Sequence, residues 1–112
     1  MMDKSDFDET CIRALIEDLG EDLGHEILGV FFSATGGDLD FLCRIECEDN
    51  RNLIRSRARS IDSAAVAFGF NLVSRLAREL ETDAATVSAP DFETRVAALN
   101  DAFIAARSRI SR

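Results

Sequence analysis

Two arginines and an aspartate are the residues of this sequence whose spacing best suits binding chemistry. They lie in residues 55–69, which read RSRARSIDSAAVAFG. Arg55 and Arg59 are four residues apart and Asp62 follows Arg59 by three, so on a helix they would be surface neighbours. A guanidinium is a permanent cation whose fork of N–H donors matches a carboxylate. The segment therefore predicts either a docking surface for an acidic partner or a solvent-exposed face with a weak helical ion pair.

The same segment predicts a helix with an apolar side and a polar side. At about 100° per residue, the side expected to face a core carries Leu53, Ile54, Ala58, Ile61, Ala64, Ala65 and Phe68. The opposite side carries Asn52, Arg55, Arg59, Asp62, Ser63 and Val66. Arg57 falls within the apolar arc. It must either extend past the neighbouring helix to solvent or meet an acid there, and the sequence leaves both open.

Helical periodicity extends along the rest of the chain, and no segment has the alternation of a strand. We expect a short first helix from Phe7 to Leu19, ended by Gly20. The stretch Thr35-Gly36-Gly37 is expected to break the next apolar pattern, so that Asp38 caps a separate helix. The further helices are expected at 23–34, 39–45, about 51–68 and 72–80, with a turn at 46–50.

The last helix has the most regular apolar stripe of the sequence. Residues 82–89 are expected to form a loop, and Pro90 suits the first turn of the helix that follows. The stripe consists of Phe92, Val96, Leu99, Phe103, Ala106 and Ile110, at spacings of three and four. Taken together, residues 1–112 predict one all-α domain: an antiparallel four-helix bundle with an additional short N-terminal helix.

The net charge and the distribution of apolar residues exclude some classes of partner and some cellular locations. The net charge of −8 argues against nucleic acid or an anionic membrane as the main partner. The longest nearly apolar run, residues 27–34, is too short to span a bilayer. The first residues, MMDKSDFDE, are acidic and lack the apolar centre of a signal peptide. A cytoplasmic location is therefore expected.

Cysteine and histidine are too few to predict a metal site or another cofactor. Cys11, Cys43 and Cys47 are an odd number and are expected to be reduced thiols, the last two on one side of a helix. His25 is the only histidine. There is also no glycine-rich loop with a lysine and no Ser/His/Asp set, so nucleotide-binding and hydrolase readings lack support.

The order of these segments resembles the histidine-containing phosphotransfer (HPt) family of phosphorelays. The family motif is His-x-x-Lys-Gly, then five residues and a glycine, on an inner helix of a four-helix bundle. Here Arg59 begins the corresponding segment and Gly69 ends it. Residues 19–23 (LGEDL) and 27–31 (ILGVF) resemble the first two family helices, and residues 76–81 (LARELE) resemble a later one. The resemblance covers nearly the whole chain.

Three of the four motif positions depart from the family. Arg59 stands where the phosphoacceptor histidine would be, Asp62 replaces the lysine, and Ser63 replaces the first glycine. Only Gly69 is retained. Phosphotransfer needs a nucleophilic imidazole nitrogen, and a guanidinium stays protonated. The chain is therefore not expected to be an enzyme.

The resemblance implies a module that binds a receiver domain or a histidine kinase without accepting phosphate. Arg59 would enter the acidic pocket of the receiver, with Arg55 supporting it and Val66 adding apolar contact. Asp62 would hold Arg59 in place or repel wrong partners, and the small Ser63 would leave room for approach.

Two other readings stay open. One is active phosphotransfer through an unidentified residue, although His25 has no lysine or arginine within helical reach. The other is a helical-bundle interaction protein outside phosphorelays.

Overall fold

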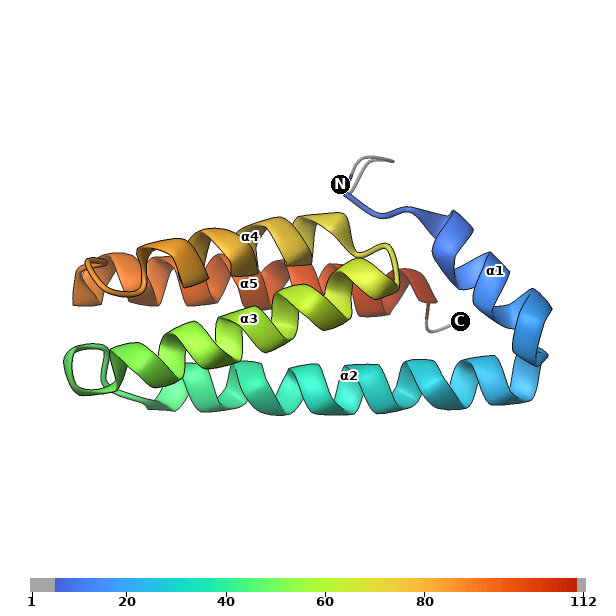
Figure 1. Ribbon diagram of the computed structural model, residues 1–112, viewed down its shortest axis with the longest axis horizontal. Coiled ribbons are helices and arrows are strands. Elements are labelled where there is room, and N and C mark those ends of the chain that lie inside the picture. Colours follow the sequence, from blue (N-terminus) through green and yellow to red (C-terminus); the bar gives the residue numbers. More distant parts are fainter. Residues whose placement is uncertain (1–5, 111–112) are drawn as a thin grey trace.

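Five α-helices and one 3-10 turn make up the secondary structure of residues 6–110, the range that this computed structural model describes (Figure 1). The first five residues of the acidic N-terminal stretch lie outside it. The elements are α1 (Glu9–Leu19), α2 (Glu21–Arg44), the 3-10 turn η1 (Glu48–Asn50), α3 (Arg51–Ala67), α4 (Asn71–Asp83) and α5 (Ala89–Ile110). Residues 6–110 contain no strand, so the predicted all-α class is confirmed.

The four longer helices form an antiparallel bundle (Figure 1). Helices α3 and α4 form a closely packed hairpin, α5 packs on α4 and on α2, and α2 also packs on α3. The short helix α1 lies at one end of the bundle and packs on α2. The predicted four-helix bundle with an extra N-terminal helix is thus confirmed.

Helix α2 is continuous, and the predicted break at Thr35-Gly36-Gly37 is wrong. It runs for 24 residues through this stretch. Thr35 is buried, and Gly36 faces the Phe103 ring of α5. Each glycine costs a helix roughly 1 kcal/mol relative to alanine, but packing of the apolar face against other helices outweighs such propensities.

Arg57 meets an acid of the neighbouring helix, which answers the question that the sequence left open. Its Nη1 lies 2.9 Å from Oδ1 of Asp38, and its guanidinium stacks 4.4 Å from the centre of the Phe41 ring. Asp38 therefore does not cap a helix, as predicted, but sits inside α2 and links it to α3.

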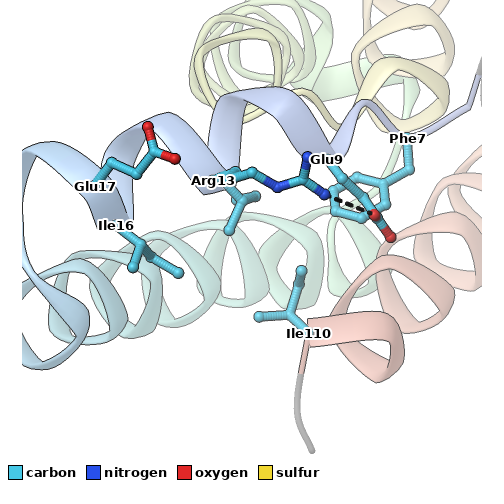
Figure 2. Close-up of a pocket in the computed structure, with 7 residues that line it drawn as sticks. Phe7, Glu9, Arg13, Ile16, Glu17 and Ile110 are labelled. Atoms are coloured by element: carbon cyan, nitrogen blue, oxygen red, sulfur yellow. Dashed lines mark ion pairs between the residues drawn. The ribbon is translucent and has the colours of Figure 1, made fainter.

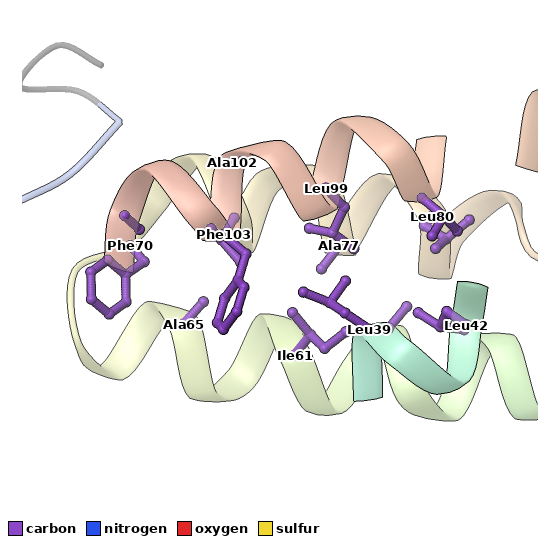
Figure 3. Close-up of a cluster of buried hydrophobic side chains, with 14 of the residues drawn as sticks. Leu39, Leu42, Ile61, Ala65, Phe70, Ala77, Leu80, Leu99, Ala102 and Phe103 are labelled. Atoms are coloured by element: carbon purple, nitrogen blue, oxygen red, sulfur yellow. The ribbon is translucent and has the colours of Figure 1, made fainter. Parts of the chain in front are cut away.

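The core is built from the faces that the periodicity predicts, with small differences at the edges. On α5, the stripe from Phe92 to Ala106 is buried and Ile110 is partly exposed. On α3, the buried residues are Ile54, Ala58, Ile61 and Ala65, whereas Leu53 is 44% exposed and Ala64 and Phe68 are half-buried. Figure 3 shows Leu39, Ile61, Ala77 and Leu99 pointing into the space between the helices.

The connections confirm most predicted boundaries. Gly20 ends α1 with a positive φ of 87°, η1 lies in the predicted turn, and Pro90 is in the first turn of α5. The loop predicted at 82–89 is shorter, because α4 extends to Asp83 and α5 begins at Ala89.

Cys43 and Cys47 were predicted to lie on one side of a helix, and this prediction is wrong. Cys43 is exposed near the end of α2, whereas Cys47 follows that helix and is buried. The difference arises because α2 ends at Arg44 and the chain turns before Cys47. All three thiols are free, as expected. Among residues 6–110, no helix has the length and apolar composition needed to cross a membrane.

Candidate functional site

Arg55 and Arg59 lie side by side on the outward face of α3. The buried residues of this helix point toward the core, which places side chains half a turn away in solvent. Both arginines are exposed, and neither forms an ion pair with any residue in the range 6–110. Two uncompensated cations on adjacent turns make this face locally basic in a chain of net charge −8.

Ser63 and Val66 continue the same face by one and two further turns. Both are exposed, and Val66 leaves 51% of its surface accessible. We call Arg55, Arg59, Ser63 and Val66 the Arg59 surface. It offers two guanidinium groups, a small hydroxyl side chain and an exposed aliphatic group, which is the mixture of charged and apolar contacts found in protein interfaces.

Asp62 was predicted to lie on the same face as Arg59, but in the structure it does not. Its side chain turns toward α4 and is only 17% exposed. There it accepts a hydrogen bond from Ser74 Oγ at 2.5 Å and two from Arg78, each at 3.3 Å. The prediction was wrong because Asp62 lies at the edge of the polar arc, where the α3–α4 contact supplies these partners.

Ser74 and Arg78 are site residues that the sequence reading missed. Ser74 is buried on the core-facing side of α4, and Arg78 is four residues later on the same helix. A serine inside an otherwise apolar stripe was the available signal, because a buried hydroxyl needs a hydrogen-bond partner. The partner of Ser74 depends on how α3 and α4 align, and the residue pattern of α4 alone does not reveal that alignment.

Gly69, which the sequence resemblance aligns with a motif glycine, supports the N-terminal segment and lies outside the Arg59 surface. Its φ is 80°, and a Cβ atom there would overlap the carbonyl oxygen of Asp8. The Asp8 N–H donates to the Gly69 carbonyl at 2.8 Å, and the Leu72 N–H donates to the Asp6 carbonyl at 2.9 Å. These two backbone hydrogen bonds therefore hold the extended segment before α1 against the turn between α3 and α4.

His25, the only histidine of the sequence, forms a hydrogen bond within its own helix. His25 is exposed on α2, and its Nδ1 lies 2.7 Å from the Glu21 carbonyl oxygen, which fits an imidazole N–H donating to that oxygen. No ion-pair partner of His25 occurs within the described range. In the same range, no cluster of three or more His, Cys, Asp or Glu side chains is placed to hold a metal ion.

An apolar groove of about 280 Å³ lies between α1 and the end of α5 (Figure 2). Ile12, Ile16 and Ile110 are among its lining residues, and none of the Arg59 surface contributes to it. The rim acid Glu9 is shared between Arg13 and Arg109, at 3.9 and 2.8 Å. Glu17 also lines the groove and forms no ion pair within residues 6–110. Because none of the Arg59 surface lines this groove, we assign it no role in the candidate site.

Comparisons of the chain with protein-family models, curated proteins and solved structures give no match.

Proposed function

We propose that this protein is a degenerate HPt-like module that binds a receiver domain, or a histidine kinase, of a phosphorelay and does not accept phosphate. One observation carries the proposal. At the position where the resemblance places the phosphoacceptor histidine, an exposed arginine stands without a counter-ion in residues 6–110. Such a role would place the module in the cytoplasm.

The bundle supports this proposal because it presents the altered motif in the way that docking requires. Arg59 lies near the middle of α3, and α4 and α2 support that helix from behind. A rigid helix presents side chains more accurately than a loop does. The surface therefore needs little rearrangement on binding.

The chemistry of Arg59 favours binding over transfer. A guanidinium stays protonated at physiological pH, so it is a much weaker nucleophile toward phosphorus than a neutral imidazole. It does donate a pair of parallel hydrogen bonds to a carboxylate. In the acidic pocket of a receiver, Arg59 would pair with those carboxylates, while Arg55 adds charge and Val66 packs at the edge.

The test is calorimetric titration of candidate receivers and kinases with wild type and Arg59→Ala. We expect Arg59→Ala to lose about 2–5 kcal/mol of binding free energy, because acids of the partner remain buried and unpaired. Its unfolding free energy should change by less than about 0.5 kcal/mol, since the position is exposed. Arg13→Ala is the matched control, because it removes the same charge from the 70%-exposed arginine of α1. Equal affinities of wild type and Arg59→Ala for a partner that binds would contradict the proposal.

Phosphorylated receiver supplies a second arm of the same experiment. We expect wild type to bind it and remain unlabelled. Label that disappears in His25→Ala would identify His25 as an acceptor, and label that survives would indicate another residue; either result refutes a binding-only module. Failure of every receiver and kinase to bind would favour a helical bundle outside phosphorelays.

A further inference from the structure

Asp62, Ser74 and Arg78 form a hydrogen-bonded network across the α3–α4 contact. Ser74 Oγ donates to Oδ1 of Asp62 and accepts from Nη2 of Arg78 at 3.1 Å. Arg78 also donates from Nε to Oδ2 and from Nη2 to Oδ1 of Asp62. Both carboxylate oxygens of Asp62 are therefore occupied by side chains of α4.

Without this network, Asp62 has an alternative partner in its own helix. Arg59 precedes it by three residues, and oppositely charged side chains at that spacing pair on a helix surface. An Arg59–Asp62 pair would cancel the charge of Arg59 and direct its N–H donors to a carboxylate of its own chain. Arg78 supplies two of the three hydrogen bonds that hold Asp62 against α4, and Ser74, which is 2% exposed, supplies the third.

We infer that Arg78 and Ser74 are positioning residues for the Arg59 surface. They hold Asp62 against α4, which leaves the Arg59 guanidinium available to a carboxylate-rich partner. Arg78 acts through Asp62 and does not need to touch that partner. The inference rests on the proposed function only for the partner's identity; its acidic character follows from the uncompensated charges of Arg55 and Arg59.

A measurement without any partner tests whether Arg59 competes with Arg78 and Ser74 for Asp62. The NMR signal of the Arg59 side-chain Nε–Hε group reports pairing through its chemical shift and its exchange with water. In Arg78→Ala we expect Asp62 to capture Arg59, so the signal shifts and exchange slows. In the double variant Arg78→Ala/Asp62→Asn the signal should return to its wild-type position. An Arg59 signal that is identical in wild type and Arg78→Ala would overturn the inference.

Titration with a hexaglutamate peptide, followed at the same signal, tests the consequence for binding. Arg78→Ala should weaken binding roughly two- to fivefold, the size of one exposed ion pair, and the added Asp62→Asn should restore it. A double variant as weak as Arg78→Ala would mean that Arg78 contacts the peptide itself, and the positioning role would be wrong. Arg75→Ala, an equal charge change on exposed α4 surface outside the network, should leave the Arg59 signal in place.

The NMR result for Arg59 can be interpreted whether or not a receiver or kinase binds. If no receiver or kinase binds wild type, the proposed function fails, yet the Arg59 signal in Arg78→Ala still decides whether the network controls Arg59. If a receiver binds and the signal does not respond to Arg78→Ala, the docking proposal stands and this inference fails. Ser74→Ala, which keeps Arg78, should shift the signal in the same direction by a smaller amount.

Discussion

At the residue scale, Gly69 is the position with the strictest steric requirement. Its φ of 80° lies in the region that L-residues with a side chain rarely adopt. A side chain there would also displace the N-terminal segment at Asp8, whose N–H bonds to the Gly69 carbonyl. Gly69 thus has a folding role that is independent of any partner.

Gly69→Ala should lower the unfolding free energy by about 2–3 kcal/mol, through left-handed strain and the loss of close packing at Asp8. Urea denaturation measures this. Gly37→Ala is the matched control: no atom lies within 4 Å of a Cβ built there, and the site is inside α2. We expect that control to be stabilised by about 0.5–1 kcal/mol. Unchanged stability of Gly69→Ala would show that the turn relaxes without cost.

At the element scale, the contact between α2 and α3 depends on more than apolar packing. Asp38 is 18% exposed and Arg57 40% exposed, and Arg57 also covers the Phe41 ring. A partly buried, hydrogen-bonded pair of this kind holds two helices in one register. Its loss would leave Asp38 with a desolvated charge and no partner.

A double-mutant cycle with Arg57→Met and Asp38→Asn should give a coupling free energy of about 1 kcal/mol. Methionine keeps an apolar stem over Phe41, so the cycle isolates the ion pair. The Arg44–Asp40 pair is the control, because its members are 71% and 66% exposed within one helix. Its coupling should be only about 0.3 kcal/mol. Equal couplings in both cycles would mean that burial does not strengthen the Arg57 pair.

At the scale of the whole molecule, α1 is the helix least embedded in the structure. Ile12 is its only buried residue among Glu9–Leu19. It is held by the segment before it, where Phe7 stacks on Phe70 at 5.1 Å, and by the Arg109–Glu9 ion pair at 2.8 Å. Helices α4 and α5 are also joined by an ion pair, between Asp83 at the end of α4 and Arg95 of α5. The hydrogen bond to Asp83 is the main reason that the pKa of Arg95 is raised.

Hydrogen exchange should therefore show α1 opening before the four-helix bundle. We expect Phe7→Ala to speed exchange of the α1 amides roughly tenfold or more while α3 amides change less. Phe103→Ala is the contrasting variant, because Phe103 is buried where α5 faces α2 and its loss should affect the whole bundle. A uniform acceleration in Phe7→Ala would show that α1 and the bundle unfold as one unit.

The sequence by itself determined the features that depend on local chemistry. The α5 stripe from Phe92 to Ala106, the helix from Arg51, the end of α1 at Gly20 and the break between the helices expected at 51–68 and 72–80 all appear as expected. Side-chain period and glycine's backbone freedom are properties of a few consecutive residues, so they can be read without knowing what lies opposite. The same period placed Arg55, Arg59, Ser63 and Val66 on one exposed face.

Only the tertiary structure decided the features that depend on a neighbouring helix. Packing on α3 and α5 kept α2 helical through Gly36 and Gly37, against their local preference. Asp38 pairs with Arg57 across 19 residues and Asp62 with Arg78 across 16. The physical reason is that a charged side chain takes the partner that helix alignment brings nearest, and that alignment is set by core packing across the whole bundle.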